Sequence, residues 1–314
     1  MRDVRIGVVG ATGAVGTVTL ELLAARGFER VRAFASARSA GKTIGFGSET
    51  LEVEEATPES LRAVGLDLLF FSVGTDASRE LVPHGVEGGA VCIDKSDAYR
   101  LTDGIPLVVA GVNDDVLNGD TIVANPNCSA IQLSCVLGPL EEAVGLERVR
   151  LATYQSMSGA GDAGIERLRA VQPLEADLAM DWDSDGEEFS EEWKLRAETR
   201  KILGLSELPL HATCVRVPVL VGHAQAVWVE TRDALSPEEA RAVLEDAPHV
   251  ALAELPTPRV AAGRDEVLVG RIRRDSTTEH GLALWVVNDN LRKGAALNAI
   301  QIAESLLARR LLAA

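Results

Sequence analysis

The ten residues GVVGATGAVG, at positions 7–16, decide how the first part of the chain folds. The apolar run Val4–Val9 leads into them and predicts a strand, and Val15–Arg26 follows and predicts a helix. Glycines in such a loop let the backbone approach a phosphate group, which then rests on the unpaired N–H groups of the helix N-terminus. The spacing is G-x-x-G-x-x-G and not the commoner G-x-G-x-x-G, so a purely structural turn is the alternative to a dinucleotide-binding loop.

Short strands and helices alternate through the first part of the chain. Several of the strands are continuous apolar runs, as expected for a parallel sheet that is covered on both faces. The alternation predicts an α/β domain of the Rossmann-like, doubly wound type. The expected strands are Val4–Val9, Val31–Ala35, Asp67–Val73, Ala90–Asp94, Leu107–Ala110 and Thr121–Ala124, and the expected helices are Val15–Arg26 and Asp76–Val86.

The second half of the sequence has longer strands, and it predicts an α+β domain with a mixed sheet. We expect residues 1–127 and a C-terminal helix at about 293–314 to form the nucleotide-binding domain, and residues 128–292 to form the second domain. The acidic segment Gln172–Phe189 is expected to be a loop. The expected strands are Arg148–Ser156, Cys214–Leu220, Gln225–Thr231 and Leu282–Val287, and the expected helices are Asp162–Ala170, Glu191–Leu203, Pro237–Asp246 and Lys293–Arg310.

The end of the second expected strand indicates which dinucleotide the glycine loop binds. A domain that binds NAD usually has an acidic residue there, which bonds the ribose 2′-hydroxyl. Here the sequence reads Ala35-Ser36-Ala37-Arg38-Ser39, an arginine between hydroxyls and no acid. This set favours NADP, whose 2′-phosphate the arginine would bind, although a solvated surface arginine is the alternative.

The composition limits the partners of the chain. Among 314 residues, 47 are acidic and 31 basic, which gives a net charge of −16. Such a charge repels polyanions, so we expect neither nucleic acid nor an anionic membrane surface as a partner. No apolar run approaches the ~20 residues that cross a bilayer, and no signal-peptide core follows the first methionine. The four cysteines show no spacing typical of a metal site, so we expect a cytoplasmic protein with reduced thiols and no metal.

Cys128 lies in the sequence NPNCSA, at residues 125–130. Pro126 and two asparagines end the strand Thr121–Ala124, and the apolar run Ile131–Leu140 predicts a helix. The thiol therefore lies at or just before a helix N-terminus, where the helix dipole favours a thiolate and lowers the pKa of a cysteine. A buried, unreactive cysteine is the alternative on position alone.

Taken together, these segments resemble the aspartate-β-semialdehyde dehydrogenases, most closely the subfamily of Gram-positive bacteria. The resemblance implies reduction of aspartyl phosphate with NADPH to aspartate semialdehyde, NADP and phosphate, a step of amino-acid biosynthesis. It also implies dimers or tetramers that form through the second domain, which would be the catalytic and dimerisation domain. The segments run in family order: the glycine loop, SARSAG at 36–41, NPNCSA at 125–130, TYQ at 153–155, SGAG at 158–161, WDSDG at 182–186, CVRVPV at 214–219, GH at 222–223 and WVVNDNLRKGAALN at 285–298.

The resemblance also implies roles for individual residues. Cys128 matches the nucleophile that forms an acyl-thioester, His223 the general acid/base and Gln155 the residue that orients the acyl group. The ordinary histidine pKa of about 6.5 would suit His223 to that role. Arg216 matches the residue that binds the substrate carboxylate. The further substrate contacts are Glu191 for the amino group and Arg100 and Lys194 for the phosphate; the cofactor contacts are Gly10, Thr12, Gly13, Ala14, Val15, Ser36, Arg38, Ser39, Ser158, Gly159 and Asn290.

Without the resemblance, His223 would be read as a structural histidine, and Glu191 and Lys194 as a solvated helix face. The sister class N-acetyl-glutamyl-phosphate reductase shares the chemistry but has different motifs around the cysteine. A catalytically silent NADP-binding sensor is the alternative outside the enzymes. A paralogue that acts on a modified aspartyl or another acyl phosphate also stays open, because the chain departs from the family pattern at Lys95, Asp97, Ala130, Ser156 and Met157.

Overall fold

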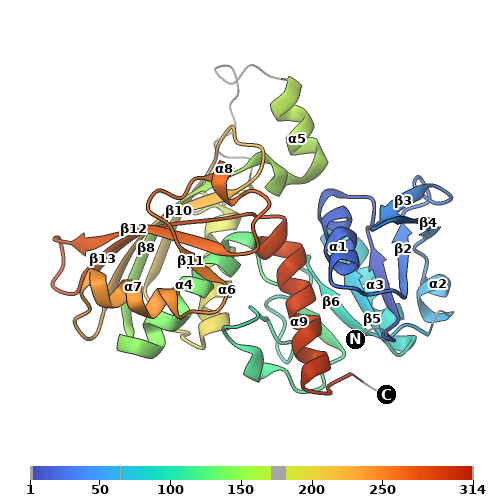
Figure 1. Ribbon diagram of the computed structural model, residues 1–314, viewed down its shortest axis with the longest axis horizontal. Helices are drawn as coiled ribbons and strands as arrows, with labels where there is room; N and C mark the ends of the chain where they lie inside the picture. Colours follow the sequence, from blue (N-terminus) through green and yellow to red (C-terminus); the bar gives the residue numbers. More distant parts are fainter. Residues whose placement is uncertain (1–2, 64, 171–181, 313–314) are drawn as a thin grey trace. The chain divides into compact units, whose positions relative to one another are not determined.

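The computed structural model describes residues 3–63, 65–170 and 182–312. The chain forms two compact units, one of Met1–Pro126 with Ala295–Ala314 and one of Asn127–Gly294 (Figure 1). Much of the expected acidic loop, residues 172–181, lies outside the described residues, and in the remainder Ser184 and Phe189 form an isolated antiparallel bridge.

The first unit is built on a seven-stranded sheet in the order β3-β4-β2-β1-β5-β6-β7, parallel except for β3. Side chains alternate between its faces, so that Ile6 and Val8 join the core formed with helices α1 and α9, while Val9 joins the core under α2 and α3. The expected α/β architecture is confirmed. The elements are β1 (Ile6–Val9), α1 (Ala14–Ala25), β2 (Val31–Ala35), β3 (Thr43–Phe46), β4 (Glu49–Glu55), α2 (Pro58–Ala63), β5 (Leu68–Phe71), α3 (Thr75–Glu87), β6 (Val91–Asp94), β7 (Ile122–Ala124) and α9 (Leu297–Ala308).

One expected strand of this unit is wrong. Leu107–Ala110 forms only an isolated bridge, between Leu107 and Ala124. The reason lies in the side chain of Asn298, which bonds the N–H of Ala110 at 3.1 Å and the carbonyl of Val108 at 2.9 Å. These backbone groups are therefore satisfied without a strand ladder.

The second unit is built on a six-stranded mixed sheet in the order β11-β12-β13-β10-β8-β9. Helix α4 packs on β8, β10, β12 and β13, and α6 packs on β9. Inward and outward residues alternate along β8 and β10, and Tyr154 and Trp228 are exposed on the outward side. The elements are α4 (Cys128–Val144), β8 (Leu146–Gln155), α5 (Gly161–Ala170), α6 (Ser190–Leu203), β9 (Leu210–Arg216), β10 (His223–Thr231), α7 (Pro237–Glu245), β11 (Val250–Leu252), α8 (Pro258–Ala261), β12 (Val267–Asp275) and β13 (Gly281–Asn288).

Two expected elements of the second half differ from the structure. The strand expected at Cys214–Leu220 runs instead over Leu210–Arg216, because Pro218 has no N–H with which to continue the ladder. The C-terminal helix begins as a π-helical segment, Arg292–Ala296, before α9 starts. No helix within the described ranges combines the length and the apolar character that crossing a membrane requires.

Candidate active site

Cys128 is the first residue of α4, as the sequence predicts. The preceding residue caps the helix: the Asn127 side chain accepts a hydrogen bond from the Ser129 N–H at 2.8 Å. The Asn127 N–H in turn donates to Glu198 at 2.6 Å, which holds the segment before the thiol. Cys128 is partly exposed at this helix start, where the unpaired N–H groups favour a thiolate.

The other three cysteines differ from Cys128 because all of them are buried. Burial raises the pKa of the thiols of Cys92, Cys135 and Cys214, which makes these three poor nucleophiles. None of the four forms a disulfide. Of the four cysteines, Cys128 is therefore the one whose surroundings suit a reactive thiolate nucleophile.

Four neighbouring strands bring a row of polar side chains to one end of the second sheet. In the strand register, Arg216 of β9 lies beside Gln155 of β8. The pairing of Ala224 with Tyr154 sets His223 of β10 level with Gln155, and His223 pairs with Asn288 of β13. We call these four residues, Arg216, Gln155, His223 and Asn288, the polar row.

Paired residues point to the same face of a sheet, so the polar row lines one face. Helix α4 packs on that face, since Gln225, two residues after His223, donates to the carbonyl of Ser129 at 2.9 Å. A Cβ placed on Gly294 would lie 3.2 Å from both the Cys128 Cβ and the Asn288 Nδ2. The thiol therefore lies at the Asn288 end of the polar row.

His223 is fully buried, and its two ring nitrogens have different surroundings. The Ser156 N–H donates to Nδ1 at 3.0 Å, and because an N–H can only donate, the neutral ring carries its proton on Nε2. Nε2 has no hydrogen-bond partner among the described residues. A Cβ on Gly159 would lie 3.1 Å from this Nε2 and 2.9 Å from Nη1 of Arg216, so the backbone of Gly159 passes closely by both groups.

The expectation that His223 keeps an ordinary pKa is wrong. Burial lowers the pKa of His223 to about 3, and the nearby positive charge of Arg216 acts in the same direction. The ring is therefore neutral at physiological pH and presents an N–H at Nε2. Sequence alone could not show this, because the pKa depends on burial.

Glu191 connects the start of the cysteine helix to the polar row. Its Oε1 accepts one hydrogen bond from the Asn127 side chain at 3.0 Å and one from the Gln155 side chain at 2.8 Å. The other end of the Gln155 amide accepts from the Thr153 hydroxyl at 2.9 Å, so the orientation of this amide is fixed. Lys194 follows Glu191 by one helical turn on α6 and is partly buried.

Arg216 is buried beside aromatic and backbone groups. Its guanidinium carbon lies 4.5 Å from the ring centroid of Trp182, close enough for a cation–π interaction. Its Nη1 donates to the carbonyl of Ser156 at 3.2 Å. An arginine this deeply buried needs partners that compensate its charge, and a planar carboxylate ligand would supply a bidentate one.

Two of the expected cofactor residues, Ser158 and Asn290, lie in the same unit as His223. Their side chains bond each other at 2.9 Å, and the Ser156 hydroxyl donates to Asn290 Oδ1 at 3.0 Å. Ser156 also places its hydroxyl 3.1 Å from Nδ1 of His223. This departure from the family pattern thus joins the histidine to the expected cofactor residues, while Met157 and Ala130 are buried core residues.

The glycine loop in the first unit leaves no room for a side chain at Gly10 or Gly16. Gly10 has φ +81°, and a Cβ on this residue would lie 2.3 Å from the carbonyl oxygen of Ser72. A Cβ on Gly16 would lie 2.1 Å from the carbonyl oxygen of Gly10. The loop joins β1 to the N-terminus of α1, with Thr12 exposed and Gly13, Ala14 and Val15 partly buried. A glycine loop that leads into a helix N-terminus is the arrangement that can hold a pyrophosphate group.

The loop after β2 carries the expected 2′-phosphate residues. Ser36 and Arg38 are exposed, and Ser39 is partly buried with its hydroxyl 3.4 Å from that of Thr12. The two loops are therefore adjacent, and both open toward solvent. The residues present fit a dinucleotide cofactor.

The expected phosphate-binding Arg100 lies in the first unit, in the segment after β6. Its guanidinium donates to the carbonyls of Lys95 at 2.6 Å and Asn125 at 3.1 Å. Burial lowers the pKa of Lys95 to about 7, although Asp94 favours the charged form, and its Nζ bonds Ser72 at 2.8 Å. Of the other departures here, Asp97 accepts a hydrogen bond from Thr75 at 2.7 Å.

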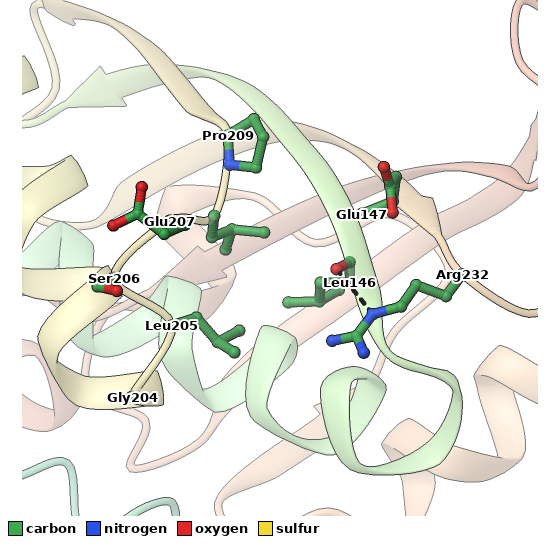
Figure 2. A pocket seen from close by; sticks show the side chains of 9 residues that line it. Leu146, Glu147, Gly204, Leu205, Ser206, Glu207, Pro209 and Arg232 are labelled. Carbon is green, nitrogen blue, oxygen red and sulfur yellow. Dashed lines mark hydrogen bonds between the residues drawn. The ribbon is translucent and has the colours of Figure 1, made fainter.

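A separate pocket of about 410 Å³ in the second unit holds no member of the polar row. Figure 2 shows Leu146, Arg232 and the segment from Gly204 to Pro209 around it. Arg232 donates to the Leu146 carbonyl at 3.4 Å and to Glu141 at 2.9 Å. Both hydrogen bonds join Arg232 to other residues of the same unit, so we assign them a structural role.

The polar row contains one residue that the sequence did not single out, Asn288. Asn127 and Glu198, which hold the cysteine, were also missed as individual contributors. The sequence offered a signal for Asn127, which precedes a predicted helix as capping residues do. Glu198 stands seven residues after Glu191, which places both on one face of a helix.

Comparison with known proteins agrees with this description of the two units and of the site. A model of the semialdehyde dehydrogenase NAD-binding domain matches residues 5–119, and a model of the semialdehyde dehydrogenase dimerisation domain matches residues 137–293. Among curated relatives, the aspartate-semialdehyde dehydrogenase of Corynebacterium melassecola is 43% identical over 96% of this chain and 99% of its own length. That of Bacillus subtilis is 39% identical over 97% and 98%.

Solved structures give the same result. Aspartate semialdehyde dehydrogenase II of Vibrio cholerae, in complex with ASA, superposes with a TM-score of 0.92 at 38% identity over 98% of this chain and 99% of that one. The enzyme of Candida albicans with NADP has a TM-score of 0.81 at 28% identity over 98% and 99%. The fold and the site define a semialdehyde dehydrogenase with a nucleotide-binding and a dimerisation domain. Within that class, the chain belongs to the aspartate-semialdehyde dehydrogenase family.

Proposed function

We propose that the protein catalyses the NADP-dependent reductive dephosphorylation of aspartyl phosphate to aspartate semialdehyde. The observation that carries the proposal is the position of Cys128, at a helix N-terminus, against the polar row that contains Gln155, Arg216 and His223. This arrangement supplies a nucleophile, a fixed amide, a carboxylate-binding cation and a hydrogen-bond donor. Family membership agrees with it.

In this mechanism the Cys128 thiolate attacks the acyl carbon, phosphate leaves, and a thioester remains. Bound NADPH supplies a hydride to the acyl carbon. The resulting thiohemiacetal oxyanion collapses to the aldehyde and returns the thiolate, so that the sulfur ends the cycle as it began.

His223 acts as a hydrogen-bond donor in its proposed acid/base role. Its neutral ring offers Nε2–H to the acyl oxygen, where negative charge develops in both addition steps. Arg216 binds the substrate carboxylate, and Gln155 orients the acyl group with an amide that Glu191 and Thr153 hold in place. Glu191 keeps its Oε2 for the substrate ammonium, and Arg100 and Lys194 are the proposed phosphate ligands.

An assay run in the oxidative direction tests the proposed reaction. We expect reduction of NADP with aspartate semialdehyde to require phosphate or arsenate as the acceptor of the acyl group. Activity with a different semialdehyde and none with aspartate semialdehyde would instead identify a paralogue. Absence of activity with every semialdehyde would favour a silent nucleotide-binding protein.

We infer that the cofactor is NADP and not NAD, since Arg38 and the neighbouring hydroxyls replace the usual acid after β2. Replacing Arg38 by alanine should lower kcat/KM for NADPH by about tenfold to a hundredfold, because a charge-assisted bond to the 2′-phosphate is lost. The value for NADH should hardly change. Lys42, an exposed cation in the same loop, provides the control: Lys42→Ala should leave both values unchanged. An equal fall for both nucleotides in Arg38→Ala would contradict the assignment.

We further propose that two copies associate through the outward face of the second sheet. Trp228 is 37% exposed there, and the rings of Tyr154 and Trp285 lie 5.5 Å apart. Such aromatic groups are typical of protein–protein interfaces. Sedimentation of the purified protein should give a dimer or tetramer.

A further inference from the structure

We propose that Asn288 is a further catalytic residue, whose side-chain amide donates a hydrogen bond to the Cys128 sulfur when it is a thiolate. The inference rests on the proposed role of Cys128 as nucleophile. It deepens that role by naming the group that stabilises the anion.

The first observation is the position of Asn288 in the polar row. Asn288 pairs with His223 across β13 and β10, so both side chains lie on the face that α4 covers. The row contains Arg216, Gln155 and His223, each with a proposed catalytic task. The fourth position of the polar row is occupied by the side-chain amide of Asn288 and not by an apolar side chain.

The second observation is that this amide is unpartnered. Asn288 is fully buried, and neither its Nδ2 nor its Oδ1 has a hydrogen-bond partner among the described residues. A buried amide without partners costs about 1–3 kcal/mol of stability. Other buried asparagines of the chain are bonded at both ends, as in Asn113, which accepts from the Val109 N–H at 2.9 Å and donates to the Leu107 carbonyl at 3.0 Å.

The third observation is the proximity of the thiol. Asn288 Nδ2 and Cys128 Cβ both lie 3.2 Å from the point where a Cβ of Gly294 would be. Gly294 has no side chain at that point, and the two distances together place the amide nitrogen no more than 6.4 Å from the Cys128 Cβ. An N–H donor there favours the ionised thiol, just as the helix N-terminus does.

The test measures the thiol itself and needs no substrate. In Asn288→Leu, which keeps the size of the side chain and removes the donor, alkylation of Cys128 by iodoacetamide at pH 7 should slow by about tenfold. The pH dependence of alkylation should move to higher pH. The melting temperature should not fall, because an unpartnered polar group has been removed from the core. An unchanged alkylation profile would overturn the proposal.

Two further variants keep the test decisive if the leucine does not fold. Asn288→Ser retains a donor and should alkylate faster than Asn288→Ala; equal rates in the two would overturn the proposal. Asn113→Leu is the control for a bonded asparagine, and it should lower the melting temperature without changing the alkylation rate. Failure of the aspartate semialdehyde assay would reject the proposed substrate but would leave this thiol measurement valid.

Discussion

Replacing Cys128 by serine should lower kcat by at least about 10⁴-fold, since removal of a covalent nucleophile can cost about 10⁶-fold. A serine hydroxyl ionises far less readily than a thiol, and the helix N-terminus that suits a thiolate cannot compensate for that difference. The fold should tolerate the change, because Cys128 is only partly buried and the Asn127 cap does not depend on its sulfur. Steady-state rates with aspartate semialdehyde, phosphate and NADP, together with thermal melts, would measure both effects.

Cys135→Ser supplies the matched control on the same helix. Cys135 is 1% exposed in the second unit, so its replacement buries a hydroxyl in place of the thiol. This variant should lose stability while its kcat stays near that of the wild type. If Cys128→Ser kept a tenth or more of the wild-type kcat, the covalent mechanism would be wrong.

The sequence predicted those helices and strands whose ends are determined by neighbouring residues, such as capping and turn residues. The Asn-Pro-Asn segment and the apolar run after it were enough to place Cys128 at a helix start, and the glycine loop was enough to place the first strand and helix. In both cases the residues that determine the structure are neighbours in the chain. Capping and turn formation are local effects, so a sequence reveals them.

The polar row could not be predicted in the same way. Gln155 and His223 are far apart in the chain, and Asn288 is farther still, so their meeting depends on strand register. A shift of one residue would turn each of these side chains to the opposite face. The strand expected at Leu107–Ala110 failed for a similar reason, because the amide of the distant Asn298 satisfies its backbone.

Replacing His223 by leucine should lower kcat by about 10²-fold to 10³-fold, because the donor to the developing oxyanion is lost. His223→Gln, which retains an N–H donor, should recover part of the rate. The profile of kcat/KM against pH should show no inflection near 6.5 from this residue, since burial lowers its pKa to about 3. An inflection near 6.5 that disappears in His223→Gln would contradict the neutral ring.

The stability of the protein should report the same lowered pKa. Between pH 6.5 and about 3 the unfolded chain binds a proton on His223 that the folded chain excludes. Protonation therefore favours the unfolded state in that window, and the free energy of unfolding should fall as the pH is lowered, by up to about 1.4 kcal/mol per pH unit from this group. Denaturant unfolding at several pH values would measure the slope, and the same series with His223→Gln should be flatter by that amount. Parallel curves for the two proteins would mean that His223 titrates alike in the folded and unfolded chains, and the ring would then be partly protonated, and not neutral, near neutral pH.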